Sequence, residues 1–195
     1  MRFHHLAAIQ QMALDHGPDG ASELDWRWGA VLTIDVVEFS RLMHADARQA
    51  YRLYKRHRDE LVDPKLREYR ARFVKSTGDG IMAEFPAAVD AARCAVDVQR
   101  SMAARCRGPA SDRRVIFRIG LSCGRVMADQ EDIYGHDVNV AARLQTVAPP
   151  GGIAMSSEVA GFVRNTLALA LTDMGMQRFH NMDVPVHVFY CGFSD

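Results

Sequence analysis

Apolar residues are concentrated in short runs that predict strands. The segment AVLTIDVV, Ala30 to Val37, is apolar except for Thr33 and Asp35, as is typical of a strand covered on both faces. The β-favouring residues Phe73 and Val74 precede Gly78-Asp79-Gly80, and an apolar run from Ile81 to Phe85 follows it. Because Asp-Gly sequences favour tight turns, Phe73 to Phe85 is predicted to form a hairpin with Asp79 at its tip.

Apolar residues at helical spacing predict three helices between these strands. The segment from Ala47 to Tyr69 alternates charged and apolar residues as an amphipathic helix does, and Pro64 is expected to kink or restart it. Pro86 is expected to open a second helix, Ala87 to Cys106, and a third is predicted from Gly135 to Val147.

The remaining pattern completes an α+β arrangement. We expect a helix capped by Ser156 and short strands at Val115–Cys123, Arg125–Ala128 (after Gly124), Ile153–Met155, Leu169–Thr172 and Val184–Tyr190. This order fits a sandwich built on a ferredoxin-like βαββαβ core. Residues 1–28, with a short predicted helix from His4 to Leu14, form an N-terminal appendage, and residues 29–195 form the main domain.

Composition narrows the classes of partner. The chain has 195 residues, 48% of them hydrophobic, and 24 basic residues balance 24 acidic ones. No overall field therefore favours nucleic acid or an anionic membrane. No apolar run reaches the length of a membrane span and the N-terminus lacks a secretory pattern, so we expect a cytoplasmic protein or a cytoplasmic piece of a larger one. The four cysteines form no C-x-x-C pair, which predicts reduced thiols and no zinc site.

Three polar features are candidates for chemistry, and each has an ordinary alternative. Asp35 leaves a buried strand and could bind a cation or cap the next helix. Asp79, between two glycines, could ligate a hard cation or sit in a solvated turn. Asn139 and Arg143 are four residues apart and share one helix face, which could line a site or face solvent.

Five separated segments occur in an order that resembles a known family. They are IDVVEFSRLM at 34–43, VKSTGDG at 74–80, FRIGLSCG at 117–124, DIYGHDVNVAARL at 132–144 and PGGIAMSS at 150–157. Together they resemble the catalytic domain of class III nucleotidyl cyclases, the adenylate and guanylate cyclases. The resemblance covers about residues 29 to 191.

The resemblance implies a metal centre and a triphosphate site. Asp35 and Asp79 match the two metal-binding aspartates, and a backbone carbonyl, that of Ile34 or preferably Val36, is implied as a further ligand. Two divalent cations, magnesium or manganese, are expected there. The substrate-binding positions include Phe39 and Ser40, in the turn whose backbone amides face the triphosphate.

The resemblance also assigns the nucleoside end of the site. Lys75 matches the lysine that reads the adenine ring and Asp132 its acidic partner, while Asn139 matches the residue that orients the ribose. Arg143 matches the arginine that stabilises the transition state. Adenine presents a ring-nitrogen acceptor and an amino donor, so a lysine and an aspartate complement it, whereas guanine wants the reversed pattern.

The implied function is conversion of ATP to 3′,5′-cyclic AMP and pyrophosphate by two-metal catalysis, in a homodimer whose sites lie at the subunit interface. Two positions depart from the family: Glu38 replaces a usual glycine, and His180 stands where a phosphate-contacting lysine is common. Both changes weaken triphosphate binding. The alternatives are therefore a guanylate cyclase, a weak or inactive cyclase-like domain that binds nucleotide or a partner, and a purely structural dimerisation domain.

Overall fold

The computed structural model describes residues 25–105 and 115–193, so the predicted helix at His4–Leu14 lies outside the described residues. The strands are β1 (Asp25–Val36), β2 (Arg72–Thr77), β3 (Gly80–Phe85), β4 (Phe117–Ala128), β5 (Ile133–Tyr134), β6 (Ile153–Ser156), β7 (Thr172–Gln177) and β8 (Val186–Cys191). The helices are α2 (Phe39–His57), a π-helical turn η1 (Arg58–Val62), α3 (Asp63–Glu68), α4 (Ala88–Arg105), α5 (His136–Val147) and α6 (Ser157–Arg164).

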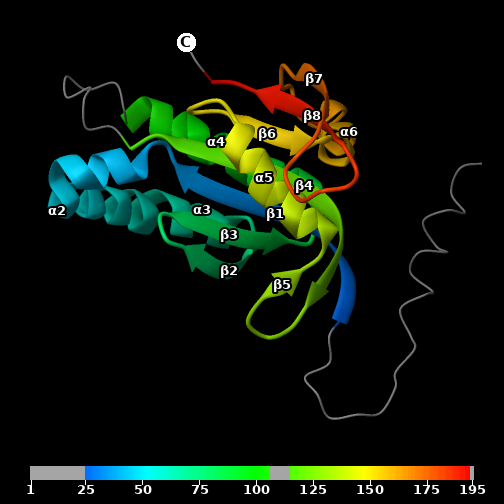
Figure 1. Ribbon diagram of the computed structural model, residues 1–195, viewed down its shortest axis with the longest axis horizontal. Helices are drawn as coiled ribbons and strands as arrows, with labels where there is room; N and C mark the ends of the chain where they lie inside the picture. Colours follow the sequence, from blue (N-terminus) through cyan, green and yellow to red (C-terminus); the bar gives the residue numbers. More distant parts are fainter. Residues whose placement is uncertain (1–24, 106–114, 194–195) are drawn as a thin grey trace, which may run out of the picture.

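One sheet organises the fold, in the order β2-β3-β1-β4-β6-β8-β7 with β5 paired to β4 (Figure 1). The first four of these strands have the order and connections of the predicted ferredoxin-like βαββαβ core. Strands β1 and β4 pair antiparallel over their whole length, from Asp25 opposite Ala128 to Val36 opposite Phe117. This ribbon is the spine of the molecule.

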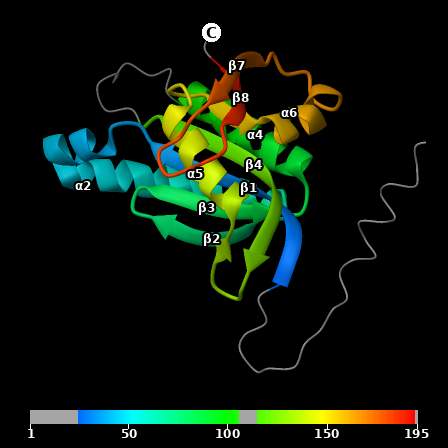
Figure 2. The ribbon, with the colours of Figure 1, turned by 45° about the vertical axis from the view of Figure 1, so that its right-hand side comes forward.

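Helices cover the two faces of the sheet unequally. The larger core lies between the sheet and α2, α3, α4 and α6, and it includes Phe85, Phe117 and Ile153, each at most 1% exposed. Among the described helices, only α5 packs on the other face, across β1, β4 and β6 (Figure 1). Beyond α5, the β4–β5 hairpin and the first residues of β1 extend past the sheet (Figure 2).

Helix α5 lies unusually close to β4 because two positions of the strand are glycines. A Cβ atom on Gly120 would lie less than 3.0 Å from the backbone of Ala141 and Gln145, and one on Gly124 would collide with the Asp137 carboxylate. Sequence reasoning took Gly124 as a break between two strands, and that prediction was wrong. The glycine makes room for the helix while β4 continues through it.

Most predicted elements are confirmed with shifted ends. The long helix begins at Phe39 rather than Ala47, and the non-helical residue Asp46, whose carboxylate accepts the Gln49 amide, marks the kink between its two parts. Pro64 restarts the chain as α3 after the π-helical turn. The strand expected at Leu169–Thr172 is wrong. Leu169 and Leu171 pack on the larger core outside any strand, and the mostly exposed segment from Thr172 to Gln177 forms edge strand β7.

Candidate functional site

Asp35 is the second-last residue of the buried strand β1 and lies beside a cationic side chain from the neighbouring strand. It lies opposite Arg118 in the β1–β4 ladder, and Nη2 of Arg118 donates to Oδ2 of Asp35 at 2.6 Å. Arg118 also donates to the Thr146 carbonyl at 3.2 Å, and its buried Nε has no partner. Asp35 does not cap α2, because the N-cap position is Glu38. The capping alternative is therefore wrong.

Asp79 lies at the tip of the β2–β3 hairpin, as predicted, and its carboxylate faces that of Asp35. Burial raises the pKa of Asp79, and the neighbouring Asp35 carboxylate raises it further, against hydrogen bonds from the backbone amides of Asp79 and Val36. A like-charged neighbour penalises the ionised form. The solvated-turn reading therefore does not describe Asp79, which is partly buried beside a second acid.

The residues at this end of β1 fit a hard divalent cation. Two carboxylates supply the oxygen ligands that magnesium and manganese prefer, and the repulsion between Asp35 and Asp79 is what a cation would relieve. A Cβ atom on Gly80 would lie 3.0 Å from the Ile34 carbonyl, so the glycine lets the hairpin approach the strand end closely. Within the described ranges, no cluster of three or more His, Cys, Asp or Glu residues could hold a metal.

The turn between β1 and α2 ends with a residue in the left-handed region. Glu38 has φ 52° and ψ 36°, a conformation that favours glycine. Its carboxylate pairs with Arg41 at 2.7 Å on an exposed surface. Phe39 and Ser40 follow in the first turn of α2, where backbone amides lack intrahelical acceptors. The turn can therefore present amides to an anion, while Glu38 adds a negative charge beside it.

Lys75 and Asp132 form an ion pair, with Nζ of Lys75 2.5 Å from Oδ2 of Asp132. A β-bulge in β2 makes this contact possible. Phe73 pairs with Ala83 and Lys75 with Met82, so Val74 is an extra residue. In a regular strand Lys75 would share the face of Phe73. The bulge instead turns Lys75 to the face of Met82, toward the loop between β4 and β5. The lysine side chain keeps 41% of its surface exposed.

Asn139 and Arg143 stay apart from the other predicted residues. Both are exposed on α5, and among the described residues no hydrogen bond or ion pair joins them to the carboxylates or to Lys75. His180 is exposed in the turn after β7. One chain thus brings together Asp35 with Asp79 and Lys75 with Asp132. It presents Asn139 and Arg143 on a free helix face.

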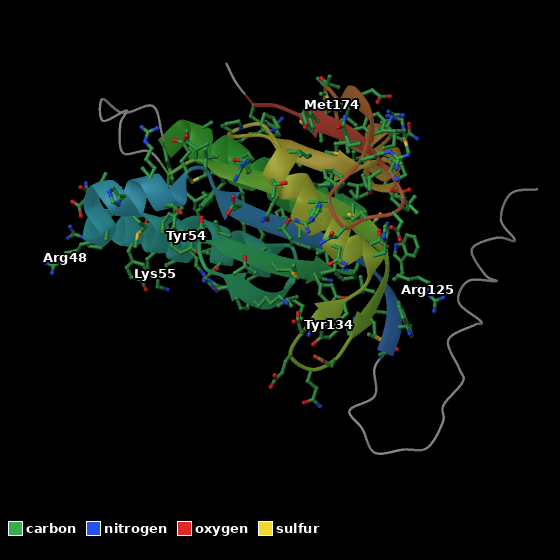
Figure 3. All side chains as sticks on the ribbon, viewed as in Figure 1. Arg48, Tyr54, Lys55, Arg125, Tyr134 and Met174 are labelled. Atoms are coloured by element: carbon green, nitrogen blue, oxygen red, sulfur yellow. The ribbon has the colours of Figure 1, made fainter. Side chains whose placement is uncertain are left out.

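Sequence reasoning missed two residues beside the carboxylates. Arg118 is the single charged residue in the run from Val115 to Cys123, and such an exception inside a strand could have marked it. Tyr54 of α2 is 5% exposed, and its buried hydroxyl lies near the Arg58 guanidinium. Burial raises the pKa of Tyr54, the neighbouring Arg58 guanidinium works against this, and the negative charge of Asp79 raises the pKa further. Figure 3 labels Tyr54.

Comparisons with known proteins agree with this geometry. The chain is 36% identical over 163 residues to "Putative adenylate cyclase 3" of Rhizobium meliloti. That alignment covers 84% of the chain but 28% of the relative. A solved adenylate/guanylate cyclase/hydrolase from Silicibacter pomeroyi superposes with a TM-score of 0.84 at 33% identity, covering 88% of this chain and all of that one.

A second solved structure, the adenylyl cyclase CyaB of Pseudomonas aeruginosa, gives a TM-score of 0.76 at 19% identity over 89% of this chain and 97% of its own. This likeness shows the shared fold. The family model described as the adenylate and guanylate cyclase catalytic domain matches residues 29–184, most of the chain. The predicted resemblance is therefore confirmed, and the chain belongs to the adenylate and guanylate cyclase catalytic domain family.

Proposed function

We propose that this chain is an adenylate cyclase, which converts ATP to 3′,5′-cyclic AMP and pyrophosphate. The observation that carries the choice of base is the Lys75–Asp132 pair, because it places a donor beside an acceptor. Adenine offers its ring nitrogen to such a donor and its amino group to such an acceptor. The partly exposed lysine can reach a base without leaving the pair.

The triphosphate end of the proposed site lies at the carboxylates. Two divalent cations, magnesium or manganese, held by Asp35 and Asp79 with a carbonyl such as that of Val36, would lower the pKa of the ribose 3′-hydroxyl and neutralise the phosphates. The 3′-oxygen then forms a bond to the α-phosphorus, the bond to pyrophosphate breaks, and the hydroxyl proton leaves to solvent.

The chain's own side chains position the substrate and neutralise charge. The amides of Phe39 and Ser40 face the phosphates, and the Arg118 guanidinium adds a positive charge beside Asp35. Asn139 orients the ribose, and the guanidinium of Arg143 spreads positive charge over the reacting phosphate. Loss of such a charge typically costs a few kcal/mol of transition-state stabilisation. His180 contacts the phosphates less strongly than a lysine would.

We further propose that the site is completed across a homodimer. Asn139 and Arg143 lie free on α5, so a second copy can join them to the carboxylates. The projecting ribbon offers a surface for this contact. Trp26 pairs with Met127, and Met127 with Tyr134, so these side chains share one face. Trp26 and Tyr134 are 51% and 43% exposed (Figure 3 labels Tyr134). Exposed aromatic clusters of this kind are typical of protein interfaces.

The first experiment measures cyclic AMP formed by the purified chain with ATP and magnesium or manganese. We expect activity that is lost in Asp79→Ala. Absence of cyclic AMP under both metals, with Asp79→Ala indistinguishable from wild type, refutes the proposal. GTP in the same assay decides between adenylate and guanylate cyclase. The double variant Lys75→Asp/Asp132→Lys keeps an ion pair but reverses its pattern, so it should shift preference toward GTP.

The dimer is tested by mixing inactive variants. Asp79→Ala and Arg143→Ala should each be inactive alone. In a mixture, half of the dimers are mixed, and one of their two sites is intact if the two residues come from different subunits. We therefore expect about a quarter of wild-type activity. A mixture that stays inactive, although sedimentation shows exchanged dimers, contradicts a site shared in this way.

A second candidate is a cyclase-like domain that binds nucleotide with little or no turnover. Two observations favour it: Glu38 places an exposed carboxylate in the triphosphate turn, and His180 replaces a usual lysine. The double variant Glu38→Gly/His180→Lys should then create activity where the parent has none. An active parent rejects this candidate. If titration shows no metal-dependent nucleotide binding, a purely structural dimerisation domain is left.

A further inference from the structure

The loop that carries Asp132 is held by a residue outside the predicted site. Residues 129–132 form a closed turn, in which the Asp129 carboxylate accepts the amides of Glu131 and Asp132 at 2.8 and 2.6 Å. The Asp129 amide in turn donates to the Asp132 carbonyl at 3.1 Å. The loop is therefore internally ordered and can be placed as a unit by contacts to its backbone.

Arg72 of β2 supplies those contacts. One of its terminal nitrogens, Nη2, donates to the Asp132 carbonyl at 3.2 Å, and the other, Nη1, to the Asp129 and Gln130 carbonyls at 3.3 and 3.5 Å. The bulge at Val74 puts Arg72 and Lys75 on the same face of β2. One strand thus holds the loop twice: Arg72 binds its backbone, and Lys75 binds its side chain.

Arg72 is itself anchored on a buried acid. Its Nε donates to Oε2 of Glu84 at 2.9 Å, and Glu84 is 5% exposed. Arg27 of β1 pairs with the same carboxylate through two hydrogen bonds of 2.6 and 2.7 Å. Gly29 makes room for it, because a Cβ there would lie 3.1 Å from Oε1 of Glu84. The carboxylate therefore links β1, β2 and β3 at one point.

We propose that Arg72, anchored on Glu84, is a positioning residue for base recognition, which holds the 129–132 loop so that the Asp132 carboxylate faces the base beside Lys75. This inference rests on the proposed role of Lys75 and Asp132 in reading the base. Arg72 uses its whole planar fork, with Nε on Glu84 and both terminal nitrogens on the loop. A lysine at this position can pair with Glu84 but cannot make the other bonds at the same time.

The experiment compares kcat/KM for ATP and GTP in wild type, Arg72→Ala and Arg72→Lys. Both variants should lower the ATP-to-GTP ratio about tenfold, as loss of an orienting partner commonly does. The loss should appear mainly in KM for ATP. Arg72→Lys keeps a cation for Glu84 and tests the loop contacts even if Arg72→Ala fails to fold. The matched control is Arg93→Ala, which removes an exposed ion pair on α4 and should leave the ratio unchanged.

The Asp132→Ala background separates positioning from a direct effect. If Arg72 acts through Asp132, then Arg72→Lys should not lower the ratio further in that background. A ratio within about twofold of wild type in Arg72→Lys, or a further full loss in the Asp132→Ala background, overturns the inference. Amide exchange at residues 129–132 should also become faster in Arg72→Lys.

A chain that makes no cyclic nucleotide would defeat the proposed activity but not this inference. The two nucleotides are then compared by equilibrium binding with manganese. A preference for ATP that is lost in Arg72→Lys supports the positioning role, and a preference that survives contradicts it. A chain that binds neither nucleotide overturns both proposals.

Discussion

Replacing Gly120 by alanine tests whether the close approach of α5 to β4 sustains both fold and activity. A Cβ at this position would lie under 3.0 Å from backbone atoms of α5, whereas ordinary contact begins at 3.4 Å. The obstacle is main chain, so rotating a side chain cannot relieve it. The helix must instead retreat by about 1 Å along its contact with the sheet.

The cost of this retreat can be bounded. Overpacking a core costs about 1–3 kcal/mol, and a rigid backbone obstacle places Gly120→Ala near the upper end. For a chain of this size, each kcal/mol lowers the midpoint of thermal unfolding by about 2–4 °C, so we expect a drop of about 6–12 °C. Cyclase activity should fall more than stability alone explains, because α5 carries Asn139 and Arg143.

Thermal unfolding followed by circular dichroism, with the cyclase assay at 20 °C below each midpoint, measures both effects. The control is Gly161→Ala in α6, where a Cβ meets nothing within 4 Å. It should raise stability by up to about 1 kcal/mol, because alanine is the better helix former. The reasoning about α5 fails if Gly120→Ala melts within about 1 °C of wild type and keeps full activity.

Three further outcomes are expected. Because the pKa of Asp79 is raised, the contribution of its protonated form to stability is complete below about pH 3.9 and is lost as pH rises through the raised pKa. Asp79→Asn should therefore abolish cyclase activity and yet raise the unfolding midpoint of the metal-free chain at pH 7. An increase in midpoint as large at pH 3 as at pH 7 would contradict this. Glu38→Gly should lower KM for ATP. The midpoint of thermal unfolding should change by less than about 2 °C, because relief of the left-handed conformation offsets loss of an exposed ion pair. An unchanged KM would show that Glu38 does not affect phosphate binding. Burial raises the pKa of the Cys94 and Cys123 thiols to about 12 and also raises that of Cys191. Iodoacetamide at pH 8 should therefore modify these three buried cysteines only in denaturant, as peptide mass spectrometry can check.

The local sequence pattern was enough to predict the helices, strands and turns that are determined by their own residues. The apolar run of β1 and the glycines around Asp79 specify a buried strand and a tight turn without help from distant residues. The fold class followed from the order of such elements. Among the described residues, the cysteines are buried and form no disulfide, and their reduced state stays a prediction.

Features that depend on contacts between distant segments could not be predicted in this way. Gly124 looks like a strand break until α5 is known to pack against it. The pairing of Arg118 with Asp35 follows from the β1–β4 register, which no local pattern encodes. Ser156 was expected to cap α6. It occupies the N-cap position, but its hydroxyl is buried and makes no hydrogen bond.

The bulge at Val74 places two consecutive side chains on the same face of β2, so packing in the core and contact with the β4–β5 loop fall to different residues. Val74 packs in a small core with Met82 and Val126, and Lys75, the next residue, reaches the β4–β5 loop from the same face. A change at position 75 would therefore alter the ion pair with Asp132 and leave the packing of Val74 in place. Under the proposed role of Lys75 and Asp132, base preference can then change at two partly exposed positions, which gives both evolution and protein engineering a route to new specificity at little cost in stability.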